Sequence, residues 1–143
     1  PVRLPGGAAA VVVLAVFFVC FELTYEILYD LRDLDGDRAA GVPTYPVVHG
    51  PRRARQIIDA LLLASAASLT FGVALGWLGL REGLMLAAPL VQFLFYRPRL
   101  SRGLTRDDCI TLTHLGTALL VFFLLGNAAW RAAGLPENIV LGG

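Results

Sequence analysis

Four carboxylates recur at helical spacing in the most polar part of this 143-residue sequence. Glu26, Asp30, Asp33 and Asp37 follow one another at intervals of four, three and four residues. At about 100° per residue, these steps return the four side chains to within roughly 40° of one another on a helix. If a helix continues through this segment, the acids form one stripe, and we expect a cation to neutralise their mutual repulsion.

A hard divalent cation is the natural partner of such a stripe. Mg²⁺ binds oxygen ligands, keeps several of its waters, and typically uses one or two carboxylates together with phosphate oxygens of a substrate. Asp33 and Asp37 lie one helical turn apart and can share one ion. The alternative is that the acids form the solvated end of a helix that leaves a membrane, where they pair with Arg32, Arg38 or the arginines that follow.

The acids belong to a longer pattern of fixed spacing. Residues 30–47 read D-L-R-D-L-D-G-D-R-A-A-G-V-P-T-Y-P-V. This pattern resembles the second aspartate-rich motif of the UbiA superfamily of intramembrane prenyltransferases, whose form is close to D-x-x-D-x-x-G-D-x-x-x-G-x-x-T-x-P-V. The resemblance is tight over residues 26–50. It is looser over the rest of the chain, whose three later apolar segments are similar to the C-terminal helices of a nine-helix bundle.

The resemblance implies an enzyme that uses Mg²⁺ to activate an isoprenyl diphosphate and transfers its prenyl group to an aromatic or other lipophilic acceptor within the membrane. The implied metal ligands are Asp33, Asp37 and Asp30, of which the first two are also catalytic. The residues implied to bind substrate are Asp30, Glu26, Arg52, Arg53 and Tyr29. For the two arginines, anchoring of an apolar segment at the membrane surface is the alternative, and for Tyr29 it is a place in the aromatic belt.

The resemblance covers one half of a metal site. The family uses two acidic clusters that face each other across a cavity, and the first of them, N-D-x-x-D-x-x-x-D, is absent from this sequence. We therefore expect a missing N-terminal half, which the start at Pro1 favours over a separate subunit or a degenerate relative. We also expect that this chain is inactive in isolation.

Two other classes of membrane protein are alternatives. A CDP-alcohol phosphotransferase needs D-x-x-D-G-x-x-A-R followed by G-x-x-x-D-x-x-x-D, but leucine follows Asp33 and the second half of the pattern is absent. A cation transporter, or a non-catalytic protein whose acids bind ions, needs polar residues along a path through its helices. The apolar segments contain few polar residues beyond Glu22, Gln92 and Asn127.

The elements that must position these residues are apolar helices. Hydrophobic residues make up 57% of the sequence and charged residues only 16%, a composition typical of a membrane protein. A helix of about 20 residues crosses the hydrocarbon core, and the candidate segments are 8–29, 57–78, 79–96 and 110–130. The third contains Pro89 and Gln92, so a kinked or re-entrant segment is the alternative there. The sequence thus predicts one all-α domain, an integral membrane bundle of about four transmembrane helices with a motif loop over residues 30–56.

The arginines predict how this bundle is oriented. Nine of the twelve lie in the segments 30–56 and 97–109, and the other three lie on the opposite side. Short basic loops stay in the cytoplasm, so the motif loop is predicted to face the cytoplasm in a multi-pass protein of the cell inner membrane. A net charge of +1 excludes bulk attraction to nucleic acid, and membrane lipid is an expected partner. Asp108, just before the last segment, is expected to cap its helix.

Overall fold

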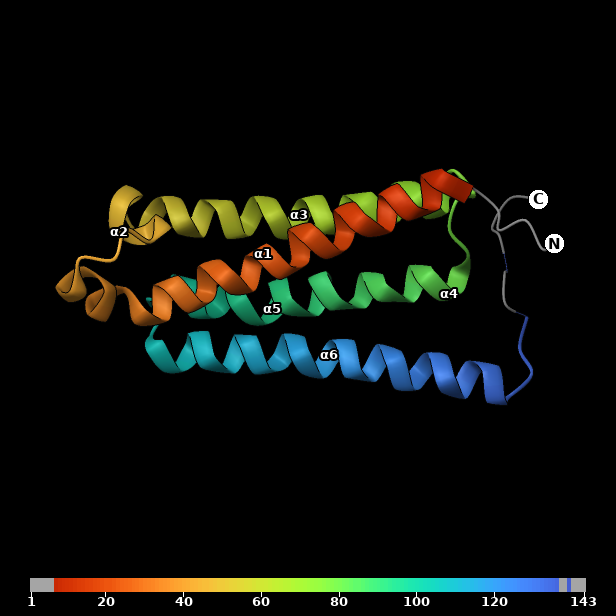
Figure 1. Ribbon diagram of the computed structural model, residues 1–143. Coiled ribbons are helices and arrows are strands. Elements are labelled where there is room, and N and C mark those ends of the chain that lie inside the picture. Colours follow the sequence, from red (N-terminus) through yellow and green to blue (C-terminus); the bar gives the residue numbers. More distant parts are fainter. Residues whose placement is uncertain (1–6, 137–138, 140–143) are drawn as a thin grey trace.

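The computed structural model describes residues 7–136 and 139, and every regular element in that part of the chain is a helix (Figure 1). The elements are α1 (Gly7–Ala40), α2 (Tyr45–His49), α3 (Pro51–Ala74), α4 (Leu80–Gly83), a 3₁₀ turn at Leu84–Leu86, α5 (Ala87–Ser101) and α6 (Arg106–Ala132). The prediction of an all-α bundle is confirmed. Within the described residues, α1, α3 and α6 are long and apolar enough to cross a membrane.

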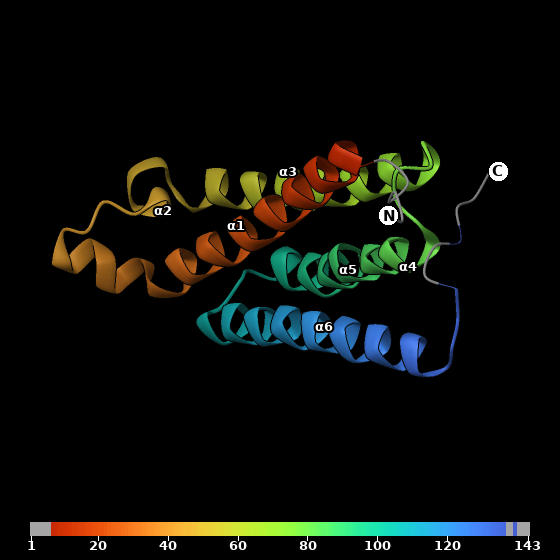
Figure 2. The same cartoon turned by 45° about the vertical axis from the view of Figure 1, so that its right-hand side comes forward.

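The longer helices form one bundle, which is visible in both views (Figures 1 and 2). α1 packs against α3 and α6, and α5 packs against the same two helices. The shared core contains fully buried side chains from each of them, such as Phe17, Leu28, Ile58, Tyr96 and Leu112. Many other large apolar side chains are exposed on the outer faces, as expected where helices contact lipid instead of water.

α1 is longer than the predicted apolar segment 8–29. It continues through the acidic residues to Ala40, so residues 30–40 of the predicted motif loop are helical. Its end is set by Gly41, which has a φ of 69°. The amide of Val42 donates to the carbonyl of Asp37 at 2.9 Å, the pattern of a glycine C-cap. Gly41 therefore ends the helix one turn after Asp37 and keeps the whole acidic stripe on one helix.

α3 begins and ends earlier than the predicted segment 57–78. Proline is favoured in the first turn of a helix, and α3 starts at Pro51, which removes residues 51–56 from the predicted loop. At the other end Gly76 has a φ of 69°, and the amide of Trp77 donates to the carbonyl of Gly72 at 2.9 Å. This second glycine C-cap ends α3 at Ala74.

The segment predicted at 79–96 is helical but broken. It consists of α4, the 3₁₀ turn and α5, and it runs on to Ser101. Pro89 lies in the first turn of α5. At this position its missing N–H costs no helical hydrogen bond, whereas in the interior of a helix its ring would clash with the preceding turn. Gln92 ties this segment to α6 because its Nε2 donates to the carbonyl of Leu112 at 3.2 Å. The kinked alternative therefore describes this segment better than a regular span.

α6 begins with a capping box in which Thr105 is the N-cap and Asp108, which was expected to cap the helix, is its partner at the third helical position. The Asp108 amide donates to Thr105 Oγ1 at 3.2 Å, and Asp108 Oδ2 accepts from the Thr105 amide at 3.2 Å. These reciprocal bonds form a capping box. Arg99 and Arg102 approach Asp108 Oδ1 to 3.1 and 2.7 Å. One buried carboxylate thus holds the turn between α5 and α6.

Replacing Asp108 by alanine is expected to lower the free energy of unfolding by about 1–2 kcal/mol, because the helix loses its capping box. Thermal unfolding in detergent, followed by circular dichroism, measures the effect. Asp107→Ala is the matched control, since Asp107 is exposed in the same turn, and its effect is expected to stay below about 0.5 kcal/mol. Equal melting temperatures for the two variants would contradict the capping role.

Candidate functional site

The acidic stripe lies at the end of α1 that adjoins α2 (Figure 1). Glu26 is exposed, and Asp30, Asp33 and Asp37 are partly buried. Residues 30–40 extend past the apolar part of the helix. The structure therefore places all four acids on one continuous helix, the condition under which the spacing forms one stripe.

Asp33 is paired on both of its oxygens. Arg32 Nε donates to Oδ1 at 3.0 Å, and the Nη2 of the same guanidinium donates to Oδ2. The Nη2 atom of Arg106, at the start of α6, lies 4.0 Å from Oδ1. The hydrogen bond from Arg32 lowers the pKa of the Asp33 carboxyl below its ordinary value, so the ionised form of Asp33 is favoured.

Asp33 and Asp37 line the same surface pocket, which has a volume of about 420 Å³. The remaining lining residues are Arg32, Asp35, Gly36 and Arg106. The pocket thus combines carboxylates from α1 with guanidinium groups from α1 and α6. Carboxylates can hold a hard cation and guanidiniums bind phosphate oxygens, so the combination suits a metal-bound phosphate.

Arg106 is a pocket residue that the sequence analysis did not single out. It reaches Asp33 only because α6 packs beside α1. In the sequence it is one of several arginines before the last apolar segment, and their order does not reveal which one faces the acidic stripe.

Asp30 faces the loop that follows α1 and is absent from the lining of the pocket. Burial raises the pKa of its carboxyl, and a hydrogen bond with the Tyr45 backbone opposes that shift. Tyr45 begins α2, where Pro46 is fully buried. The motif residues after the stripe therefore pack back against α1, and Asp30 helps to hold them.

Tyr29 is connected to the pocket through Arg32. The guanidinium carbon of Arg32 lies 4.8 Å from the centroid of the Tyr29 ring, within the range of a cation–π contact. The ring thus supports an arginine that lines the pocket. Glu26, a turn before Asp30 on the same stripe, is also outside the lining.

Arg52 and Arg53 are exposed in the first turn of α3. Arg52 lines a different surface pocket, of about 370 Å³, together with Arg55 and Asp59. Neither arginine is among the residues that line the pocket of Asp33 and Asp37. The structure therefore brings together Asp33 and Asp37 but not the two arginines that were expected to accompany them.

The carboxylates of this pocket are of a type that fits Mg²⁺. Within residues 7–136 and 139, no three acidic, histidine or cysteine side chains lie close enough to hold a metal ion by themselves. Mg²⁺ does not require three, because waters and substrate phosphate oxygens complete its octahedron around one or two carboxylates. Asp33 and Asp37 supply such a pair in one pocket.

Comparison with known proteins gives matches over most of the chain. The model of the UbiA prenyltransferase family matches residues 4–125. Digeranylgeranylglyceryl phosphate synthase of Natronomonas pharaonis is 38% identical over 74 residues, which are 52% of this chain and 27% of the relative. 4-Hydroxybenzoate octaprenyltransferase of Shewanella amazonensis is 31% identical over 112 residues, 75% of this chain and 37% of the relative.

Further relatives show the same partial coverage. Digeranylgeranylglyceryl phosphate synthase of Haloquadratum walsbyi is 34% identical over 70 residues, 49% of this chain and 24% of the relative. The chain thus spans well under half the length of these relatives. No solved structure gave a significant match.

Proposed function

Because this chain belongs to the UbiA prenyltransferase family, we propose that it takes part in Mg²⁺-dependent transfer of a prenyl group from an isoprenyl diphosphate to an aromatic or other lipophilic acceptor within the membrane. The observation that supports this most directly is the pocket that Asp33 and Asp37 share with Arg32 and Arg106. It lies at one end of an apolar bundle. That placement suits a substrate with a phosphate head and a hydrocarbon tail.

In this proposal the acidic residues of the pocket bind the metal ion and the arginines bind the diphosphate. Asp33 and Asp37 would hold the metal ion, which when bound would offset the negative charge that develops on the departing diphosphate. Arg106 and Arg32 donate hydrogen bonds to phosphate oxygens, and Arg32 exchanges its bonds to Asp33 for bonds to the substrate. The bond between the prenyl carbon and the diphosphate oxygen breaks, and its electron pair leaves with the diphosphate. The acceptor forms the new bond to that carbon and releases one proton.

We also propose that a second acidic cluster completes the site from outside these 143 residues. The support is that the first acidic pattern of the family is absent from this sequence and that the chain matches well under half the length of its relatives. An N-terminal half of the same protein, or a separate subunit, would supply the rest. The chain in isolation is therefore expected to be inactive.

The three apolar helices make the chain an integral membrane protein of its family. We propose that it lies in the cell inner membrane with the Asp33 end in the cytoplasm. The support is the distribution of arginine, since Arg52, Arg53 and Arg106 lie at that end of the bundle and short basic segments stay cytoplasmic.

One other function has a specific observation in its favour. Arg32 pairs with both oxygens of Asp33, as it would in a non-catalytic relative whose acids only neutralise nearby arginines. The family match gives no support to a CDP-alcohol phosphotransferase or a cation transporter. The choice is therefore between an active and an inactive member of one family.

Removal of divalent metal separates these two possibilities. Membranes that contain the full-length gene product are incubated with labelled isoprenyl diphosphates of several lengths and a panel of phenolic and glycerol-phosphate acceptors. We expect EDTA to lower transfer at least about a hundredfold and excess Mg²⁺ to restore it, because the metal offsets charge in the transition state. Transfer that is insensitive to EDTA, or absent with every donor and acceptor, would contradict the proposed function.

A further inference from the structure

The outer face of α1 carries a row of residues at alternating steps of three and four. The row consists of Val12, Ala15, Val19, Glu22 and Glu26, and all five are exposed. Residues at these steps share one side of a helix, and this side is turned away from the buried core residues of α1. Such spacing is typical of a seam along which a second helix packs, and a small residue in the seam lets helices in a membrane approach closely.

Glu22 distinguishes this face from a surface that only contacts lipid. It lies seven residues, or about 10 Å, before the end of the apolar run at Tyr29, so its carboxylate is at the depth of the hydrocarbon core. No ion pair joins it to a residue in the part of the chain that the structure describes. A carboxylate at this depth is costly beside lipid and normally pairs with another polar group. The face therefore requires a covering element that supplies a cation.

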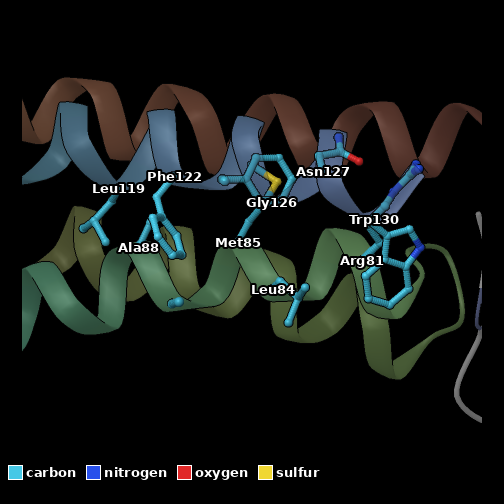
Figure 3. Close-up of a pocket in the computed structure, with 11 residues that line it drawn as sticks. Arg81, Leu84, Met85, Ala88, Leu119, Phe122, Gly126, Asn127 and Trp130 are labelled. Carbon is cyan, nitrogen blue, oxygen red and sulfur yellow. The ribbon is translucent and has the colours of Figure 1, made fainter. Parts of the chain in front are cut away.

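The hollow between α4–α5 and α6 has no such requirement (Figure 3). Its volume is about 260 Å³, its lining includes Leu119 and Phe122, and its exposed surface is almost wholly apolar. Lipid chains are as apolar as these side chains, so they cover the hollow without leaving a charge unpaired. The exposed charge on α1, in contrast, selects what covers it.

A second copy of this chain does not meet the requirement of the α1 face. In a symmetric pair the same patch lies on both sides of the interface, so Glu22 would face Glu22 and the two acidic stripes would lie opposite each other. Like charges that meet across an interface repel and disfavour that pairing. The occupant is therefore a different helix, with a basic side chain at the depth of Glu22.

We propose that this face of α1 is the docking surface for a transmembrane helix of the same protein that lies outside these 143 residues, and that an arginine or lysine of that helix pairs with Glu22. The relatives extend far beyond the residues that match this chain, which supports the existence of such a helix. The inference rests on the proposed function, in which a second acidic cluster outside this sequence completes the site. Because the row that contains Glu22 continues into the acidic stripe, a helix docked on it leads to the pocket of Asp33 and Asp37.

Photo-crosslinking in the full-length gene product tests what covers the face. Benzoylphenylalanine replaces Val19, which is 57% exposed in the row, and the protein is placed in lipid nanodiscs. Mass spectrometry is expected to identify an adduct with a peptide of the same protein outside this sequence. Phe122, which is 77% exposed in the apolar hollow, is the control position, where adducts with lipid are expected. At position 19, adducts only with lipid, with a second copy or with another protein would overturn the proposal.

Glu22→Leu in the same full-length protein tests the ion pair. We expect the melting temperature in nanodiscs to fall by about 5 °C, because leucine leaves the opposing basic group unpaired. Glu22→Gln keeps a hydrogen-bond acceptor and is expected to cause a smaller fall. Thr70→Leu is the control, since Thr70 is an exposed polar residue of α3 whose hydroxyl donates to the Ala66 carbonyl at 2.9 Å. Its melting temperature is expected to stay within about 1 °C or to rise.

The direction of the Glu22→Leu effect separates pairing from exposure to lipid. If Glu22 faced lipid, leucine would remove a costly charge, so an unchanged or raised melting temperature would overturn the proposal. Neither measurement depends on prenyl transfer. Failure of the docking surface is therefore distinguishable from failure of the proposed function, which EDTA-sensitive transfer reports.

Discussion

Replacing Asp37 by asparagine is expected to lower prenyl transfer by the full-length gene product at least about a hundredfold, and Asp33→Asn is expected to do the same. Asparagine keeps the size and the polarity of the side chain but removes the charge that holds the metal. Both acids line the pocket at the end of α1. Loss of either carboxylate breaks up the pair that lies one helical turn apart in this pocket.

The measurement is product formation per unit of protein in isolated membranes, with the amount of inserted protein set equal by immunoblot. Asp107→Asn is the control, since Asp107 is an exposed acid at the start of α6 and is absent from the pocket lining. It is expected to retain activity within about twofold. Full activity of both Asp33→Asn and Asp37→Asn would refute the assigned site.

The second large effect is expected at Gly116, where α6 packs against the Tyr25 side chain of α1. A Cβ on Gly116 would overlap the phenol of Tyr25, which is buried in the bundle. Gly116→Leu is therefore expected to force the helices apart and to lower the free energy of unfolding by about 3 kcal/mol. Thermal unfolding in detergent gives the size of the loss, and the change in helix spacing should also reduce transfer.

A compensating change tests the cause of this loss. Tyr25→Ala opens the space that leucine needs, so the double variant is expected to be more stable than the sum of the single effects predicts. Gly126→Ala on the same helix meets no atom within 4 Å and should leave the melting temperature unchanged or raise it. Additive losses in the double variant would show that overlap with Tyr25 is not the cause.

Much of the fold was predictable because hydrophobic runs and helix caps are local features. The apolar runs predicted the membrane-crossing parts of the long helices, and Asp108 indicated a cap near the start of α6. Residues 30–40 were assigned to a loop, whereas α1 continues through them to Ala40. The ends of α3 were misplaced because hydropathy continues past Ala74, whereas Gly76 turns the backbone there. The break before α5 was predicted only as an alternative, because Pro89 is compatible with a helix start as well as with a kink.

The site was predictable only where it lies on a single element. Asp33 and Asp37 share a helix, so their spacing was enough to pair them. Arg106 comes from a helix far along the chain, and Arg52 and Arg53 follow the motif closely in sequence yet line no part of the same pocket. Contacts between helices depend on how the helices pack, so closeness in the sequence did not predict which arginines line this pocket.

The most direct test of the central claim is metal binding by the full-length gene product. Mn²⁺, which replaces Mg²⁺ at oxygen sites, is titrated by electron paramagnetic resonance in the presence of an unreactive isoprenyl thiodiphosphate. We predict bound Mn²⁺ that requires the diphosphate analogue and is lost in the Asp33→Asn, Asp37→Asn double variant. The same Mn²⁺ binding in the double variant as in the unaltered protein would contradict the account, because the metal would then be held without the acidic stripe.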